Sequence, residues 1–77
     1  MAKSVFTRTY TDFRRRLVRA RKRAGLTQVQ LARRLSRPQS FVSKIERGER
    51  RVDLIEFHEL AQAIGFDPVT FLKDLYK

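Results

Sequence analysis

Residues 26–48, LTQVQLARRLSRPQSFVSKIERG, carry the local signals for two short helices and a tight turn between them. Thr27 followed by Gln30 fits a capping box and predicts a helix over 28–35. Pro38 suits the start of a second helix over 39–47, because its missing N–H is not needed there. Two capped helices around a turn of this length form a helix-turn-helix arrangement.

Similar signals divide the rest of the chain. Asp53 with Glu56 fits a second capping box, and Asp67 before Pro68 is a candidate N-cap, so we expect helices over 12–24, 54–64 and 68–76. Glycines follow three of the five segments, at positions 25, 48 and 65. Without strand alternation, repeat or linker, the sequence predicts an all-α, compact five-helix domain over 11–77. Residues 1–10 are expected to be a basic, weakly structured lead-in.

Apolar residues of two helices fall on single arcs at about 100° per residue, which predicts the core-facing sides. The arc of the first helix holds Phe13, Leu17, Ala20 and Ala24. The arc of the fourth holds Leu54, Phe57, Leu60, Ala61 and Ile64. The last helix carries more apolar surface than docking requires, so we expect a dimer interface there, although it could simply close the core. That surface comprises Val69, Phe71, Leu72, Leu75 and Tyr76.

Charge and composition narrow the classes of function that are expected for this chain. The net charge is +10, made of +13 in residues 1–52 and −3 in residues 53–77, so one part suits a polyanion. The chain has no cysteine and one histidine, His58, which we interpret as a surface or interface residue. We therefore expect no metal site, cofactor or catalytic residues, and no enzyme activity. No signal core or membrane-spanning run is present, and a cytoplasmic location is expected.

Three phrases carry a family resemblance: LTQxxLA at 26–32, VSKIERG at 42–48 and LAQAIG at 60–65. In this order they resemble the phage repressor/Cro-like (xenobiotic-response-element) family over about residues 13–66. The resemblance implies a lambda-repressor-like domain that binds operator DNA, usually as a symmetric dimer. Ser36 stands where glycine is frequent, and Arg37 where the residue is commonly apolar. We therefore expect an altered turn, strained if Ser36 has a positive φ.

The helix over 39–47 separates polar from apolar side chains, which suits a helix that reads DNA. The candidate base-reading residues are Gln39, Ser40, Ser43 and Lys44. The resemblance places Gln39, Ser40 and Lys44 at base-reading positions and Gln28 at a phosphate-contacting one. Arg47, Arg50 and Arg51 are further candidate phosphate contacts. Phe41 borders both arcs, so packing and a thymine or sugar contact both stay open.

The resemblance also implies a salt bridge between Arg21 and Glu46. Both residues lie beside apolar arcs, where an unpaired charge would be costly to desolvate. Two separately solvated charges are the alternative. The run 14–16 with Arg19, Lys22 and Arg23 is interpreted mainly as a solvated face of the first helix, with only part of it near DNA.

The leading functional prediction is a sequence-specific regulator of transcription that binds double-stranded operator DNA as a homodimer. Size and layout resemble stand-alone restriction–modification controllers and small prophage or antitoxin-type repressors. The main alternative is an antitoxin-type protein that also binds a partner toxin. RNA binding is weaker, because the sequence shows no aromatic base-stacking array.

Overall fold

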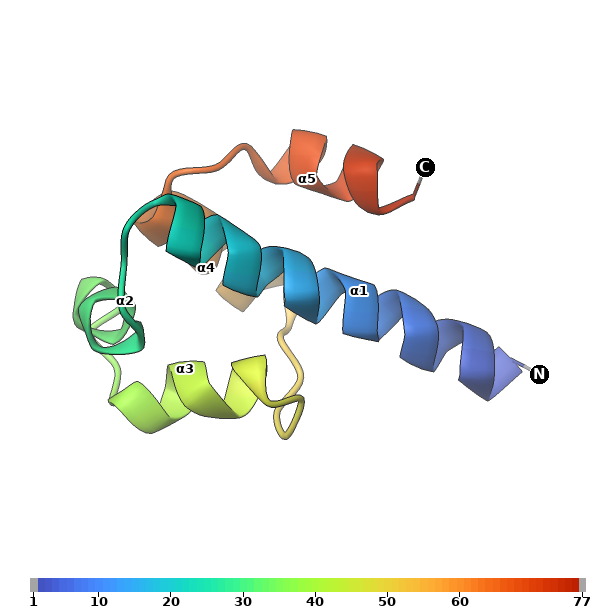
Figure 1. The fold of residues 1–77 in the computed structure, drawn as a ribbon, viewed down its shortest axis with the longest axis horizontal. Coiled ribbons are helices and arrows are strands. Elements are labelled where there is room, and N and C mark those ends of the chain that lie inside the picture. Colours follow the sequence, from blue (N-terminus) through green and yellow to red (C-terminus); the bar gives the residue numbers. More distant parts are fainter. Residues whose placement is uncertain (1, 77) are drawn as a thin grey trace.

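The computed structural model describes the backbone of residues 2–76 and the side chains of residues 8–76. It contains five α-helices and no strand within residues 2–76, so the expected all-α fold is confirmed. The helices are α1 (Ala2–Arg23), α2 (Gln28–Arg34), α3 (Gln39–Glu46), α4 (Leu54–Ile64) and α5 (Pro68–Leu75). In Figure 1, α1 runs through the middle of the molecule, with α2 and α3 on one side and α5 on the other.

The core lies where α1, α2, α3 and α4 meet. Leu31 and Val42, from the two helices of the helix-turn-helix, are each only 2% exposed. Burying an apolar side chain of this size contributes about 1.5–3 kcal/mol, so this contact is a main source of stability. The other buried members of the cluster are Leu17, Ala32, Phe41, Ile45, Phe57, Leu60 and Ile64.

Four phenylalanines extend this core toward the C-terminus. They are Phe13 on α1, Phe57 on α4, Phe66 in the loop before α5, and Phe71 on α5. Neighbouring ring centroids lie 4.8–5.9 Å apart, within the range of favourable aromatic pairs. This cluster packs α5 against α1 and α4.

Local capping fixes the helix boundaries. Both capping boxes, Thr27 with Gln30 and Asp53 with Glu56, are present, and Asp67 accepts a hydrogen bond from the backbone N–H of Thr70. Ser36 has a φ of 55°, so the strained turn expected there is confirmed. The expected boundaries of α4 are correct, and the other four helices end one residue earlier than expected.

The start of α1 differs from the expectation. The helix was expected to begin at Asp12 after a weakly structured lead-in, but it begins at Ala2. Neither proline nor glycine occurs between Ala2 and Arg23 to end a helix. Tyr10 also belongs to the folded domain, because its hydroxyl group donates to the Arg50 carbonyl and accepts from the Val52 N–H.

The core-facing arc of α4 is shorter than expected. Phe57, Leu60, Ala61 and Ile64 are buried, but Leu54 is 75% exposed. Periodicity places Leu54 on the same arc, yet it is the first residue of the helix and projects beyond the packed core. Within residues 2–76 no helix combines the length and apolar character needed to cross a lipid bilayer.

Candidate nucleic-acid interface

The two faces of α3 have opposite environments. Gln39, Ser40 and Lys44 are exposed, and Ser43 is half-buried, with its hydroxyl group bonded to the Ser40 carbonyl at 3.3 Å. The opposite face buries Phe41, Val42 and Ile45 in the core. All four candidate base-reading residues therefore lie on the polar side of one helix whose other side is fixed by packing.

Glu46, the last residue of α3, is held by Arg21 of α1. Arg21 Nε donates to Glu46 Oε2 at 2.6 Å and Nη2 donates to Oε1 at 3.0 Å. Each side chain is 10% exposed, and Arg21 Nη1 donates to the Leu26 carbonyl at 2.7 Å. The two residues expected to pair thus lie in a bidentate, nearly buried ion pair with additional hydrogen bonds, the geometry in which such a pair is stable.

Arg14 forms a second link from α1 to the same end of α3. Its Nη1 donates to the Glu46 carbonyl at 2.7 Å, where the helix dipole favours a positive charge. Its guanidinium also lies over Gly48, so that a Cβ there would be 3.1 Å from Arg14 Nε. Sequence reasoning had placed Arg14 in a mainly solvated run. The missed signal is its spacing of seven residues from Arg21, which puts both on one face of α1.

Gln28, the candidate phosphate contact at the start of α2, also binds this ion pair. Its Nε2 donates to Glu46 Oε1 at 2.9 Å, and its Oε1 accepts from Gln39 Nε2 at 3.4 Å. The hydrogen bonds therefore run from Arg21 through Glu46 and Gln28 to Gln39. This chain connects the fixed end of α3 with a residue on its exposed face.

The loop after α3 carries the other three candidate phosphate contacts in different settings. Arg47 pairs with Glu49 at 2.9 Å, and both side chains are more than half exposed. Arg50 donates from Nη1 and Nη2 to the two oxygens of Glu56 at 2.8 and 2.7 Å. The guanidinium of Arg51 lies over the Tyr10 ring, 4.5 Å from its centroid.

Glu56 anchors this loop to α4. Its hydrogen bonds from Arg50, followed by the backbone N–H of Asp53 and the charges of Arg50 and Arg37, lower its pKa from 4.5 to about 2 against the opposing effect of burial. With this lowered pKa, Glu56 stays a carboxylate well into the acidic range. Arg50 is therefore the structural partner of Glu56 as well as a candidate phosphate contact.

Phe41 is packed between two of these cations. Its ring is 9% exposed, and the guanidinium carbons of Arg37 and Arg50 lie 4.4 and 4.7 Å from its centroid. Such cation–π contacts contribute about 0.5–1 kcal/mol each at exposed sites. Of the two roles left open for Phe41, packing is the one that the structure displays. Arg37, which stands in the turn where the residue is commonly apolar, makes one of these two contacts with Phe41. Its Nη2 also lies 3.6 Å from Oε1 of Glu59.

Apolar surface gathers on the side of α4 and α5. Among the residues expected at a dimer interface, Phe71 and Leu72 pack against the core, Leu75 is half-buried, and Val69 and Tyr76 are 59% and 74% exposed. Leu54 and Ile55, which were not assigned to an interface, are 75% and 67% exposed. A groove of about 600 Å³ opens here, lined by Thr9, Tyr10, Phe13, Arg51, Val52, Asp53, Leu54, Phe57, Leu72, Leu75 and Tyr76. His58 is exposed, as expected.

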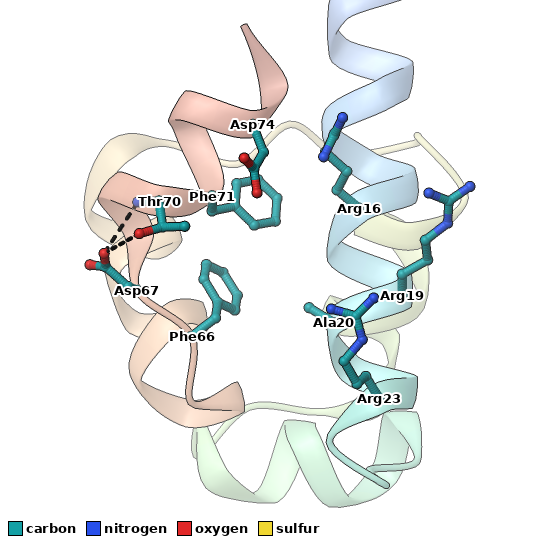
Figure 2. Close-up of a pocket in the computed structure, with 9 residues that line it drawn as sticks. All are labelled: Arg16, Arg19, Ala20, Arg23, Phe66, Asp67, Thr70, Phe71 and Asp74. Atoms are coloured by element: carbon teal, nitrogen blue, oxygen red, sulfur yellow. Dashed lines mark hydrogen bonds between the residues drawn. The ribbon is translucent and has the colours of Figure 1, made fainter. Parts of the chain in front are cut away.

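A smaller pocket of about 290 Å³ lies between α1 and α5, on the side of α1 away from α3 (Figures 1 and 2). Figure 2 shows three arginines of α1 along one wall and Phe66 and Phe71 across from them. The carboxylates of Asp67 and Asp74 line the same pocket. Asp67 also caps α5 by accepting a hydrogen bond from the backbone N–H of Thr70. Charges of both signs therefore line this pocket, and none of its residues belongs to α3.

Comparison with known proteins gives a consistent family. The helix-turn-helix domain family matches residues 12–71. The chain is 41% identical over 51 residues to the uncharacterized HTH-type transcriptional regulator y4dJ of Sinorhizobium fredii. That match spans 66% of this chain and 66% of the relative, slightly less than two thirds of its length.

Two solved structures are similar over most of the chain. An XRE-family like protein from Pseudomonas syringae pv. tomato str. DC3000 has a TM-score of 0.95 and 47% sequence identity, covering 97% of this chain and 92% of that one. The restriction-modification controller protein C.AhdI from Aeromonas hydrophila has a TM-score of 0.73 and 34% identity, covering 80% of this chain and 90% of that one.

Proposed function

Because the chain belongs to the helix-turn-helix family of DNA-binding transcriptional regulators, we propose that it binds a symmetric operator in double-stranded DNA as a homodimer. Each protomer places α3 in a major groove. The observation that carries this proposal is the division of α3 into a buried apolar face and an exposed face bearing Gln39, Ser40 and Lys44.

The exposed side chains of α3 suit base edges. An amide such as that of Gln39 can pair with N6 and N7 of adenine, and the ammonium group of Lys44 can donate to O6 and N7 of guanine. Ser40 and Ser43 are short, so they reach a base or phosphate only where the backbone of α3 comes close. We assign base reading to these four residues, with Gln39 and Lys44 contributing most to sequence preference.

Phosphate contacts supply the remaining affinity in this proposal. Residues 1–52 have a net charge of +13, and Gln28, Arg47, Arg50 and Arg51 all come from the start of α2 or the loop after α3. Such contacts fix the position of a protein on the duplex and carry no sequence information themselves. They make affinity fall steeply as the salt concentration rises.

The proposed dimer surface lies at the C-terminal part of the chain, whose net charge of −3 makes it unsuited to DNA. Leu54 and Tyr76 are exposed and both line the 600 Å³ groove, and Ile55 is exposed beside Leu54. A second copy would remove these apolar side chains from water. A two-fold dimer would place the two copies of α3 about 34–36 Å apart, one turn of DNA.

Duplex selection tests the DNA-binding part of this proposal. The parent chain is offered random duplex DNA, and its affinity for the selected sequence is compared with that for a scrambled duplex at physiological salt. We expect the selected duplex to bind about 10³-fold or more tightly, the lower end for specific regulators. Equal affinities would contradict the proposal.

Sedimentation tests the dimer surface. The double variant Leu54→Ser/Tyr76→Ser should sediment as a folded monomer and bind the selected duplex more weakly, since two apolar groups leave the interface. Val29→Ser is the matched control, because Val29 is a 40% exposed apolar residue on α2, outside the groove. A double variant that still sediments as a dimer would rule out this surface. A monomeric parent chain would favour the alternative of a different protein partner.

A further inference from the structure

The three arginines of the loop after α3 differ in what their N–H groups bind. Arg47 donates from Nε and Nη2 to Glu49, and Arg50 donates from Nη1 and Nη2 to Glu56. The side chain of Arg51 has no hydrogen-bond or ion-pair partner among residues 8–76 and instead stacks on Tyr10. Arg51 is therefore the arginine of this loop whose donors remain available.

Stacking on an aromatic ring restrains a guanidinium without using its donors. The contact is made by the flat face of the group, and the N–H bonds point outward in its plane. A phosphate can accept two parallel hydrogen bonds from that plane. The position of Arg51 over Tyr10 thus combines restraint with free donors, whereas the carboxylates beside Arg47 and Arg50 compete with a phosphate.

Tyr10 is itself fixed to the backbone on both sides of Arg51. Its hydroxyl group donates to the Arg50 carbonyl at 3.3 Å and accepts from the Val52 N–H at 3.2 Å. Its ring packs on Phe13, with centroids 5.5 Å apart. A residue of α1 that is 40 positions away in sequence from Arg50 therefore holds both the main chain and the side chain of this loop.

We infer that Tyr10 is a positioning residue that holds Arg51 ready for a DNA phosphate. This inference rests on the proposed function and assigns to Tyr10 and Arg51 a joint role in it. A restrained Arg51 loses less side-chain freedom on binding than a mobile one, which favours the complex. Of the three loop arginines, Arg51 then contributes most to the salt dependence of binding.

A double-mutant cycle tests this coupling. Tyr10→Leu, which removes ring and hydroxyl group, and Tyr10→Phe, which keeps the ring, are each made in the parent and in Arg51→Ala. Affinity is measured for the selected and the scrambled duplex over a range of salt concentrations. In the parent, Tyr10→Leu should weaken binding about two- to tenfold, as expected for losing the restraint on one long side chain, and Tyr10→Phe less. In Arg51→Ala both changes should have a much smaller effect, limited to what Tyr10 contributes through the main chain at Arg50 and Val52.

The salt dependence separates positioning from general destabilisation. Arg51→Ala should reduce the slope of log affinity against log salt by about one, and Arg47→Ala, the matched control with its donors on Glu49, by less. Tyr10 and Arg51 both line the dimer groove, so affinity is compared at protein concentrations at which sedimentation shows every variant to be a dimer. Equal losses in the two backgrounds would therefore overturn the inference.

The scrambled duplex distinguishes failure of the inference from failure of the proposed function. A phosphate contact acts on any sequence, so the coupling between Tyr10 and Arg51 should appear on both duplexes. A parent chain without preference for the selected duplex would overturn the proposed function and leave this coupling measurable. A parent chain without salt-dependent binding to either duplex would overturn both.

Discussion

The buried end and the exposed face of α3, a helix of eight residues, have different surroundings and different expected roles. At the buried end, Glu46 is bound by Arg21, Gln28 and, through its carbonyl, Arg14. On the exposed face, the side chain of Lys44 is exposed and has no hydrogen bond or ion pair with residues 8–76. Under the proposed function, Glu46 orients α3 and Lys44 reads bases, so the two roles can be changed separately at these two residues.

The largest expected effect comes from removing the buried carboxylate. Glu46→Ala leaves Arg21 without its charged partner at 10% side-chain exposure, and breaking such a pair lowers the free energy of unfolding by about 3–5 kcal/mol. Glu49→Ala is the matched control, because it removes an exposed partner of Arg47 and should change stability by about 0–1 kcal/mol. Urea titration of both variants measures the difference, and equal stabilities would mean that Glu46 is only a surface charge.

Changes on the exposed face of α3 should weaken DNA binding and leave the stability of the fold nearly unchanged. Lys44→Ala and Gln39→Ala should leave the free energy of unfolding within about 0.5 kcal/mol of the parent, as is usual for surface positions. Each should weaken binding to the selected duplex by about 1–3 kcal/mol. Thermal melting and titration with DNA together check this separation. A large fall in melting temperature would show that the two functions of α3 are not separate.

A substitution of Gly48 tests how closely Arg14 of α1 covers the buried end of α3. Alanine at Gly48 or Gly25 would have a positive φ, which destabilises by about 1–2 kcal/mol. A Cβ at Gly48 would also be 3.1 Å from Arg14 Nε, whereas a Cβ at Gly25 would meet nothing within 4 Å. Gly48→Ala should therefore destabilise more than Gly25→Ala in denaturant titrations. The difference should disappear in an Arg14→Ala background. If it persists there, the Arg14 side chain is not the cause of the larger destabilisation at Gly48.

A further expected effect concerns the pH dependence of stability. The pKa of Glu56 is lowered from 4.5 to about 2, chiefly by its hydrogen bonds with Arg50. The stabilisation that this carboxylate provides is therefore complete above about pH 4.5 and is lost as the pH falls toward 2. Glu56→Gln should remove this part of the acid dependence in denaturant titrations at successive pH values. An unchanged acid dependence would contradict the role of Glu56 as a charged anchor.

Local signals in the sequence were sufficient for the helix order and for the division of α3 into a polar and an apolar face. Capping boxes and glycines act within a few residues, so the bounds of α4 followed directly from Asp53, Glu56 and Gly65. The polar face of α3 likewise follows from helical periodicity. The contact between Arg21 and Glu46 required the family resemblance, because the two residues are 25 positions apart.

Other features depend on which distant residues meet, and periodicity does not provide that. Arg14 lies on the same face of α1 as Arg21, but only the packing of α3 on α1 shows that it reaches the Glu46 carbonyl. Leu54 shares an arc with buried residues, yet the core ends before it. Tyr10 was assigned to the lead-in because its partners, Arg50 and Val52, follow some forty residues later.

Binding-site selection from random duplex DNA, carried out with the parent chain and with Lys44→Ala, tests most directly the claim that the exposed face of α3 reads bases. We expect a two-fold symmetric consensus for the parent. For the variant we expect the same symmetry and spacing, with relaxed preference at one position in each half-site. An identical consensus for the two proteins would show that Lys44 does not face the bases and would contradict the orientation of α3 proposed for the complex.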